Sequence, residues 1–204
     1  MSDEGFLILA DISGFTAFVT ATELEHGAQV TGALLEAVME RLAPPLEIQE
    51  LEGDAVFAIG ADRLIDSRRV PTVLLEAFHG FRDLQHRIAL DDTCSCRACR
   101  QTERLNLKLI AHHGRFVRQV VGGRLRVAGP DVILAHRLLK NPVDAAGYLL
   151  FTGPALERAG VDPIASGMRE RLISYAFLGD TPCFVADPEP GWKPTFAETT
   201  SQVA

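Results

Sequence analysis

The sequence lacks an apolar run approaching the roughly 20 residues that a membrane-spanning helix requires. Near the N-terminus, Asp3 and Glu4 stand where a secretory signal would carry basic residues, and no cleavage pattern follows. Basic residues are in the minority, because 20 Lys and Arg stand against 27 Asp and Glu, for a formal net charge of −7. These absences predict a cytoplasmic protein with no membrane partner and no general nucleic-acid partner.

Cysteine is also scarce, with four residues in a chain of 204. Three of them form the pattern C-x-C-x-x-C as Cys94, Cys96 and Cys99. In a cytoplasmic chain this spacing indicates a metal site or free thiols rather than structural disulfides. Three thiolates so close in sequence can bind one Zn²⁺ if a fourth ligand joins them. The candidates for that ligand are His86, His112, His113 and a carboxylate such as Asp92.

The remaining cysteine and histidine residues fit structural roles. Cys183 lies in a strand pattern and is predicted to belong to the core. His26, His79 and His136 lie in helical stretches, where we expect surface or hydrogen-bonded residues rather than catalysts. The C-x-C-x-x-C segment is therefore the predicted zinc site, and three free thiols on a loose loop are the alternative.

The apolar periodicity predicts a single α+β domain over residues 1–187, with no internal repeat and no dividing linker. The order of elements is βαββα, insert, βββα, βα, ββ, which predicts a mainly antiparallel sheet with helices packed on one face. The Cys-rich insert covers residues 91–103. After Asp187 the chain is polar and rich in Pro, so residues 188–204 are expected to form a mobile tail.

The first half of this domain has the clearest pattern. Residues 6–10 are all apolar and predict a buried strand. Residues 15–42 follow a helical period, with a break expected near Gly27, and a second helix is expected over residues 71–90.

Two short stretches place an acid at the end of a predicted strand. Asp11 follows the apolar run 6–10 and precedes Gly14, where a turn leads into a helical pattern. Asp54 follows Gly53 in the tight turn of a predicted hairpin. If the two strands are neighbours, both carboxylates point at one spot and suit a hard divalent cation carrying phosphates. Taken singly, Asp11 is more often a helix cap, and Asp54 more often a turn residue, than a metal ligand.

Four motifs, in order, resemble the catalytic domain of the class III nucleotidyl cyclases, the adenylate and guanylate cyclases. That family shows an acid, a hydrophobic residue, any residue and Gly-Phe-Thr, and later a Gly-Asp hairpin. It then shows a strand ending in His-x-Gly and a Gly-x-x-Val-Asn-x-Ala-x-Arg helix. The resemblance covers roughly residues 6–186 and implies the ferredoxin-like-related cyclase fold, here in a divergent branch with a CxCxxC insert. The matching segments are Asp11–Thr16, Gly53-Asp54, His112–Gly114 and Gly129–Arg137.

The resemblance implies a nucleoside triphosphate ligand and a reaction at its α-phosphorus. The family joins the ribose 3′-oxygen to that phosphorus and releases pyrophosphate, using Mg²⁺ or Mn²⁺. It works as a head-to-tail homodimer in which one chain completes the site of the other. The residues that the resemblance assigns are Asp11, Asp54 and the Ile12 carbonyl for the metal, the N–H groups of Gly14, Phe15 and Thr16 for phosphates, and Arg137 for the transition state.

The chain departs from the family pattern at four positions. Ile133 replaces the Asn that orients the ribose, and its side chain cannot form a hydrogen bond. Glu50 stands where ATP-using members carry Lys, and it resembles the guanine-selecting members because a carboxylate accepts from the guanine N1–H and amine. A second position also selects the base in the family. Arg126 aligns with it and fits neither of the patterns usual there. Asp180 stands near the place of a Lys that binds the γ-phosphate.

Two functions therefore stand side by side. The first is a divergent nucleotidyl cyclase that binds a nucleoside triphosphate with a divalent metal and cyclises it. The alternative is a catalytically inactive regulatory homodimer that binds a nucleotide or related ligand and contains a structural zinc site.

Overall fold

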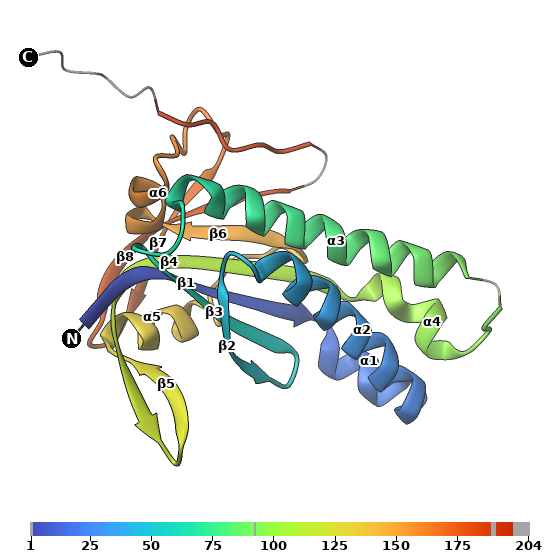
Figure 1. The fold of residues 1–204 in the computed structure, drawn as a ribbon. Helices are drawn as coiled ribbons and strands as arrows, with labels where there is room; N and C mark the ends of the chain where they lie inside the picture. The colour runs from blue at the N-terminus through green and yellow to red at the C-terminus, as the bar shows by residue number, and fades with distance from the viewer. Residues whose placement is uncertain (1, 92, 189–190, 198–204) are drawn as a thin grey trace, which may run out of the picture.

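The computed structural model describes residues 2–91, 93–188 and 191–197, and its centre is one eight-stranded sheet (Figure 1). The strand order is β2-β3-β1-β4-β6-β8-β7, and β5 pairs with β4. Neighbouring strands are antiparallel except for the parallel pair β4–β6. The predicted α+β class with a mainly antiparallel sheet is confirmed. The strands are β1 Ser2–Ser13, β2 Glu47–Glu52, β3 Ala55–Ala61, β4 Asn106–Val121, β5 Arg124–Ala128, β6 Tyr148–Thr152, β7 Arg169–Tyr175 and β8 Gly179–Ala186.

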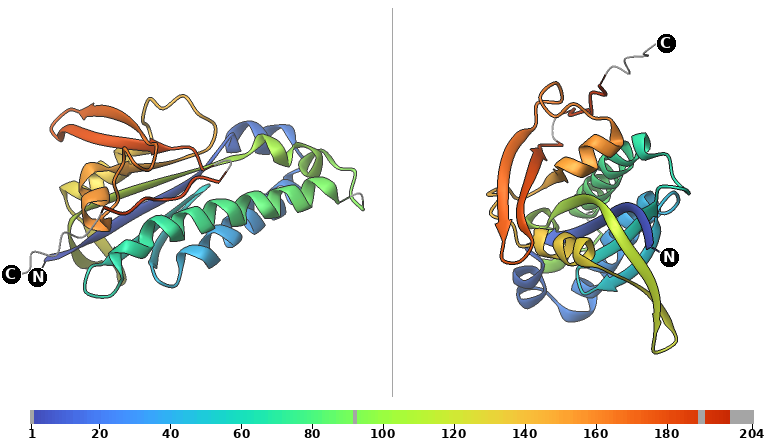
Figure 2. Two further views of the ribbon diagram at one scale, coloured as in Figure 1. Left: turned by 90° about the horizontal axis from the view of Figure 1, so that it is seen from above. Right: turned by 90° about the vertical axis from the view of Figure 1, so that its left-hand side faces the viewer.

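Helices cover both faces of this sheet. The core cluster on one face contains side chains of the long helices α2 and α3, which lie side by side along the strands (Figure 2). The α-helices are α1 Phe15–Ala21, α2 Leu24–Leu42, α3 Val70–Leu90, α4 Arg97–Gln101, α5 Pro130–Leu138 and α6 Gly153–Ala159, with short 3-10 turns at Ser67–Arg69 and Thr102–Arg104.

The position of α5 differs from the expectation that the helices share one face. Its buried residues Val132, Ala135 and Leu138 belong to a second core cluster, which is separate from the cluster of α2 and α3. The physical reason is that α5 carries its own apolar stripe, and the other face of the sheet is also apolar and must be covered. The helix with the predicted transition-state arginine therefore packs on the face opposite α2 and α3.

The central strand β1 explains why both faces need covering. Phe6 and Ile8 point into the cluster of α2 and α3, while Leu7 and Leu9 point into the cluster of α5. Successive side chains of a strand alternate between faces, so an all-apolar run indicates burial on both sides. By the same alternation, Asp11 lies on the face of Leu7 and Leu9, which is the α5 side.

The break in the first helical stretch occurs earlier than expected. α1 ends at Ala21 and α2 begins at Leu24, whereas Gly27 lies inside α2. The Thr22 hydroxyl donates to the Phe18 carbonyl at 2.9 Å and closes α1. A side chain at Gly27 would place its Cβ 2.7 Å from Thr22 Oγ1, so this glycine permits the close approach of the two helices rather than breaking one.

Part of the predicted mobile tail is packed against the domain. Trp192 donates through Nε1 to the Ser166 carbonyl at 2.8 Å, and its ring lies 6.4 Å from that of Phe151. Phe196 forms a β-bridge with Val161. These apolar side chains anchor residues 191–197 despite the polar composition around them, and residues 198–204 lie outside the described part of the chain.

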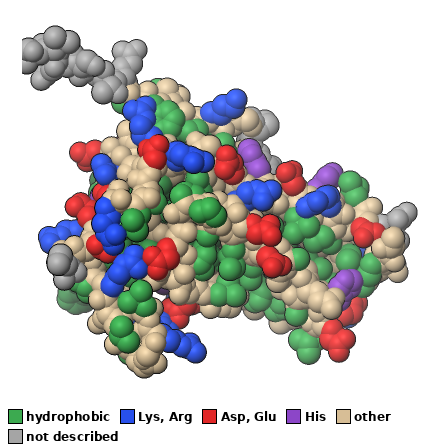
Figure 3. Space-filling view, viewed as in Figure 1, with side chains coloured by type: hydrophobic (Ala, Val, Ile, Leu, Met, Phe, Trp, Pro, Cys, Tyr) green, Lys and Arg blue, Asp and Glu red, His purple; other side chains and the backbone are tan. Residues whose placement is uncertain are grey.

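The surface carries both signs of charge. On the face drawn in Figure 3, Lys and Arg side chains are interspersed with Asp and Glu rather than collected into an area of one sign. Within the described residues, none of the helices is long and apolar enough to cross a membrane.

Candidate functional site

The two acids of the sequence motifs lie side by side at one end of the sheet. β1 and β3 are neighbours, with Asp11 opposite Ala55, and the Ile12 N–H donates to the Asp54 carbonyl at 3.2 Å. Partial burial raises the pKa of Asp54, and the charge of Asp11 raises it further. A backbone hydrogen bond and the charge of Lys108 lower this pKa and offset only part of the rise. A site that holds two repelling carboxylates is suited to a divalent cation, which would remove the repulsion.

A lysine that the sequence motifs did not include lies against this pair. Lys108 stands directly opposite Asp11 on β4, and its Nζ is 2.8 Å from Asp11 Oδ2. The same ammonium group donates to the Leu139 carbonyl just beyond α5 at 3.1 Å. Alternation in β4 indicated that Lys108 faces away from Leu107 and Leu109, but only the register of β1 on β4 places it beside Asp11. Any cation bound to Asp11 must share this carboxylate with Lys108 or displace it.

The turn after Asp11 has the backbone that the motif requires. Gly14 has φ +85°, a left-handed conformation that side chains rarely adopt, and it is the N-cap residue of α1. No side chain caps this helix start, so Asp11 is not its capping residue. The backbone N–H groups of Phe15 and Thr16 lie in the first turn of α1, immediately after the acid-bearing strand.

A pocket of about 460 Å³ lies between the β2–β3 hairpin, β5 and α5, and neither Asp11 nor Asp54 lines it. It contains both predicted base-selecting positions, and these two residues bind each other, because Arg126 Nη1 lies 2.6 Å from Glu50 Oε2. The Glu50 carboxylate is therefore already paired, and a base in this pocket must replace or share the Arg126 contact. The other lining residues are Gln49, Leu51, Glu52, Phe57, Arg124, Leu125, Val127, Val132 and His136.

The third and fourth motifs pack directly on each other. The Asp131 carboxylate, in the first turn of α5, accepts the Arg115 N–H at 2.7 Å and lies 3.3 Å from His112 Nε2. A side chain at Gly114 would place its Cβ 2.4 Å from the Asp131 carboxyl carbon. Gly114 is thus required for α5 to dock, which gives the His-x-Gly motif a structural reason.

The outer face of α5 carries the two remaining motif positions. Ile133 is 55% exposed, and Arg137, one helical turn later, is also exposed. The Arg137 carbonyl accepts the Tyr175 hydroxyl at 2.8 Å, which ties the end of α5 to β7. Asp180, the acid near the expected γ-phosphate lysine, accepts the Ser174 hydroxyl.

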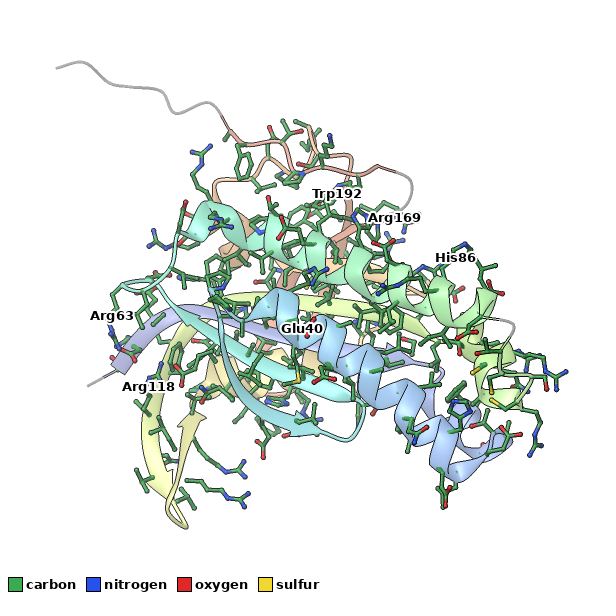
Figure 4. The ribbon with its side chains drawn as sticks, turned by 45° about the vertical axis from the view of Figure 1, so that its right-hand side comes forward. Glu40, Arg63, His86, Arg118, Arg169 and Trp192 are labelled. Carbon is green, nitrogen blue, oxygen red and sulfur yellow. The ribbon has the colours of Figure 1, made fainter. Side chains whose placement is uncertain are left out.

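The three clustered cysteines meet a histidine that we had expected to be an ordinary helix residue. His26, in the first turns of α2, has ring nitrogens next to the sulfur atoms of Cys94, Cys96 and Cys99. In Figure 4 sulfur atoms lie between α4 and the start of α2. His26 is separated from Cys94 by 68 positions, so no spacing pattern pointed to it.

The fourth-ligand candidates taken from the sequence lie elsewhere. His86, labelled in Figure 4, is on α3 and outside the cluster. His112 contacts the Thr152 hydroxyl at 2.9 Å, and His113 contacts Asp62, both within the sheet region. Asp92 lies outside the described residues.

Comparison with solved structures shows that this is the fold of nucleotidyl cyclase catalytic domains. A bacterial light-regulated adenylyl cyclase has a TM-score of 0.70 at 13% identity, covering 92% of this chain and 53% of that chain. The guanylate cyclase domain of RhGC from Catenaria anguillulae, solved in complex with GTP, has a TM-score of 0.62 at 16% identity, covering 97% of this chain and 100% of that chain. At these identities the likeness establishes the fold alone.

Comparison of sequences gives a family and a relative. A family model described as "Protein of unknown function (DUF2652)" matches residues 31–148, more than half of the chain. The "Uncharacterized protein Rv2561/Rv2562" of Mycobacterium tuberculosis is 36% identical over 121 residues, which cover 58% of this chain and 55% of the relative. The match thus spans about half the length of that relative.

Proposed function

Because the chain belongs to the family of proteins of unknown function DUF2652 and has a nucleotidyl cyclase fold, we propose that it binds a nucleoside triphosphate with Mg²⁺ or Mn²⁺ and cyclises it as a divergent nucleotidyl cyclase. The observation that carries this proposal is the adjacency of Asp11 and Asp54 at the ends of neighbouring strands. Two carboxylates and the Ile12 carbonyl form an oxygen-rich donor set, which hard divalent cations prefer.

The proposed reaction assigns a distinct task to each part of the site. Asp11, Asp54 and the Ile12 carbonyl would hold a divalent cation, which would lower the pKa of the ribose 3′-hydroxyl and neutralise the triphosphate. The ribose 3′-hydroxyl gives up its proton to water, and its oxygen forms a bond to the α-phosphorus. The bond from that phosphorus to the oxygen that bridges to the β-phosphorus breaks, and pyrophosphate leaves. The N–H groups of Gly14, Phe15 and Thr16 hold phosphate oxygens beside the acids. Glu50 and Arg126 face the base.

The exposed groups of α5 and of the β4–β5 hairpin support a second copy of the chain as partner. Arg137 and Ile133 point outward from α5. The hairpin extends from the body of the protein in Figure 1 and exposes Val120 at 71% and Leu125 at 49%. An arrangement in which Arg137 of the partner subunit reaches the acid pair would complete the site, so we propose a head-to-tail homodimer.

A second candidate function is nucleotide binding without turnover. Three observations favour it, namely Lys108 bound to Asp11, the Glu50–Arg126 ion pair and the exposed Ile133 in place of a ribose-orienting Asn. Each loss of an orienting or charge-stabilising group costs on the order of a few kcal/mol in the transition state. In this case the acids hold the metal nucleotide, and the dimer acts as a regulatory module.

The experiment that tests the proposal measures binding and chemistry separately. Equilibrium dialysis with each of the four nucleoside triphosphates, with Mn²⁺ and then with EDTA, measures metal-dependent binding, and chromatography of the same mixtures detects cyclic product. Metal-dependent binding with cyclic product supports the cyclase, and binding without product supports the regulatory module. If none of the four nucleotides binds in a metal-dependent manner, the proposal is wrong.

Lys108 gives a specific prediction about the metal. Lys108→Met should raise the apparent affinity for Mn²⁺ at least about tenfold, because a unit positive charge roughly 4 Å from a divalent cation repels it by about 2 kcal/mol even in bulk water. The measurement is a Mn²⁺ titration followed by electron paramagnetic resonance. Lys140→Met, at an exposed position after α5, is the control and should leave the affinity unchanged. An unchanged or weaker affinity in Lys108→Met would place the metal away from Asp11.

A further inference from the structure

The structure assigns a structural zinc site to His26, Cys94, Cys96 and Cys99, in which three thiolates and one imidazole bind a single Zn²⁺. The ligand atoms of these four residues all lie within 4.8 Å of one another. His26 Nδ1 is 3.0 Å from Cys96 Sγ and 3.6 Å from Cys94 Sγ, and Nε2 is 3.9 Å from Cys99 Sγ. This site is independent of the acid pair and does not rest on the proposed nucleotide function.

The spacing of these atoms suits tetrahedral zinc. With Zn–S bonds of about 2.3 Å, the sulfur atoms of a tetrahedral site lie about 3.8 Å apart, and an imidazole nitrogen lies slightly closer. All four cysteines of the chain are free thiols, so none of the three is engaged in a disulfide. Four protein ligands fill the tetrahedron and leave no open position for substrate, which is typical of structural rather than catalytic zinc.

The surrounding contacts show why the ligands converge. Cys96 Sγ accepts the Cys99 N–H at 3.3 Å, a backbone hydrogen bond to sulfur that supports a bound thiolate. The Glu23 carboxylate, just before α2, accepts the backbone N–H groups of Arg97 and Ala98 at 3.3 Å and 3.2 Å. The Glu23 carboxylate thus holds the start of α4 against the start of α2, next to His26 and the cysteines.

The same insert reaches the turn that follows Asp11. The Gln85 side chain on α3 donates to the carbonyls of Thr102 and Leu105 at 2.7 Å and 2.6 Å, which positions the end of the insert. A Cβ at Gly14 would lie 3.0 Å from the carbonyl oxygen of Arg104, the residue that follows the insert, so the chain leaving the insert packs directly on the Gly14 turn. Zinc bound to the insert therefore stabilises the packing around Gly14. Because the N–H groups of this turn are proposed to hold phosphate oxygens, zinc would also support phosphate binding. Only this last consequence rests on the proposed function.

Zinc content and zinc affinity test the assignment directly. The full chain, purified under reducing conditions without chelator, should contain about one zinc per chain by elemental analysis. In competition with a chromophoric chelator, His26→Ala should bind zinc at least about tenfold more weakly than the wild type, since even groups behind the ligands typically contribute that much. His26→Cys should retain zinc, because four thiolates also form a structural site. His86→Ala is the matched control and should bind zinc as the wild type does.

Two further measurements keep the assignment testable if His26→Ala folds poorly. Replacement of zinc by Co²⁺ in the wild type should give the intense visible absorption of tetrahedral thiolate coordination, and this spectrum should change in His26→Cys. Hydrogen exchange of residues 94–104 and 14–23 should accelerate when a chelator removes the metal, while β1 stays protected. A wild-type protein that lacks zinc, contains iron in its place, or gives the same Co²⁺ spectrum as His26→Cys would overturn the assignment. None of these readouts depends on nucleotide binding, so this inference and the proposed function fail separately.

Discussion

Asp54→Asn is expected to lose metal-dependent nucleotide binding, with apparent affinity falling at least about 100-fold. The reason is that Asp54 is one of two carboxylates proposed to hold the cation, and even residues that only support a metal ligand typically contribute 10–100-fold. The measurement is equilibrium dialysis of labelled nucleotide with Mn²⁺. Asp83→Asn, the same substitution at an exposed position of α3, is the control and should bind as the wild type does.

The folding stability of Asp54→Asn separates this result from damage to the fold. The folded-state pKa of Asp54 is raised by burial and by the charge of Asp11, so the folded protein holds the proton more tightly than the unfolded chain does. The stability that Asp54 contributes is therefore present below the unfolded pKa of about 3.9 and is lost as the pH rises through the raised pKa. At neutral pH the neutral Asn should leave the free energy of unfolding unchanged or slightly higher.

Asp11→Asn should also abolish metal-dependent binding but should behave differently in an unfolding experiment. The substitution removes the charge that pairs with the Lys108 ammonium. The Lys108 side chain is only 19% exposed, so its unpaired charge should lower the free energy of unfolding. Opposite signs of the stability change, with the same loss of binding, would identify the pair as a shared cation site. Wild-type nucleotide affinity in either variant would contradict the proposed role of the acids.

Gly5→Ala is expected to destabilise the protein by roughly 3 kcal/mol, the upper end of the range for overpacked sites. A Cβ on Gly5 would lie 2.2 Å from the Gly60 carbonyl oxygen and 2.8 Å from the Ala61 Cα. Both are backbone atoms of β3, so they cannot move without disturbing the β1–β3 pairing that also positions Asp11 and Asp54. The free energy of unfolding, from urea denaturation monitored by circular dichroism, measures the loss.

The matched control is the same substitution at an open position. Gly32 lies in the interior of α2, is exposed, and a Cβ there meets no atom within 4 Å. Gly32→Ala should stabilise the protein by about 0.5–1 kcal/mol, because Ala is a better helix former and restricts the unfolded chain. Equal effects of the two substitutions would mean that the packing around Gly5 is looser than the structure shows.

Much of the architecture follows from local pattern. The all-apolar run 6–10 predicted a strand buried on both faces, and the Gly122-Gly123 turn lies between two paired strands, as alternation and turn chemistry indicate. Element boundaries were less predictable. β1 extends to Ser13, because pairing with β3 and β4 continues past the apolar run to Asp11 and beyond.

The candidate sites were predictable only where one short motif carries the chemistry. Asp11, Asp54 and the three clustered cysteines stand out because acid-at-strand-end and C-x-C-x-x-C patterns are visible in a few consecutive residues. Lys108 and His26 were missed, since each acts on residues distant in sequence. The face on which α5 packs was missed for the same reason, because both faces of an apolar sheet attract an amphipathic helix.

By itself, therefore, the sequence predicted most of the strands and helices and several of the side chains now proposed to bind metal, because these depend on neighbours within one or two turns of chain. The tertiary structure decided which of those side chains meet. It placed Lys108 on Asp11, Arg126 on Glu50 and His26 on the cysteines, and each contact exists only because strand register and helix packing bring distant segments together. Long-range pairing is set by the burial of whole faces rather than by any local pattern.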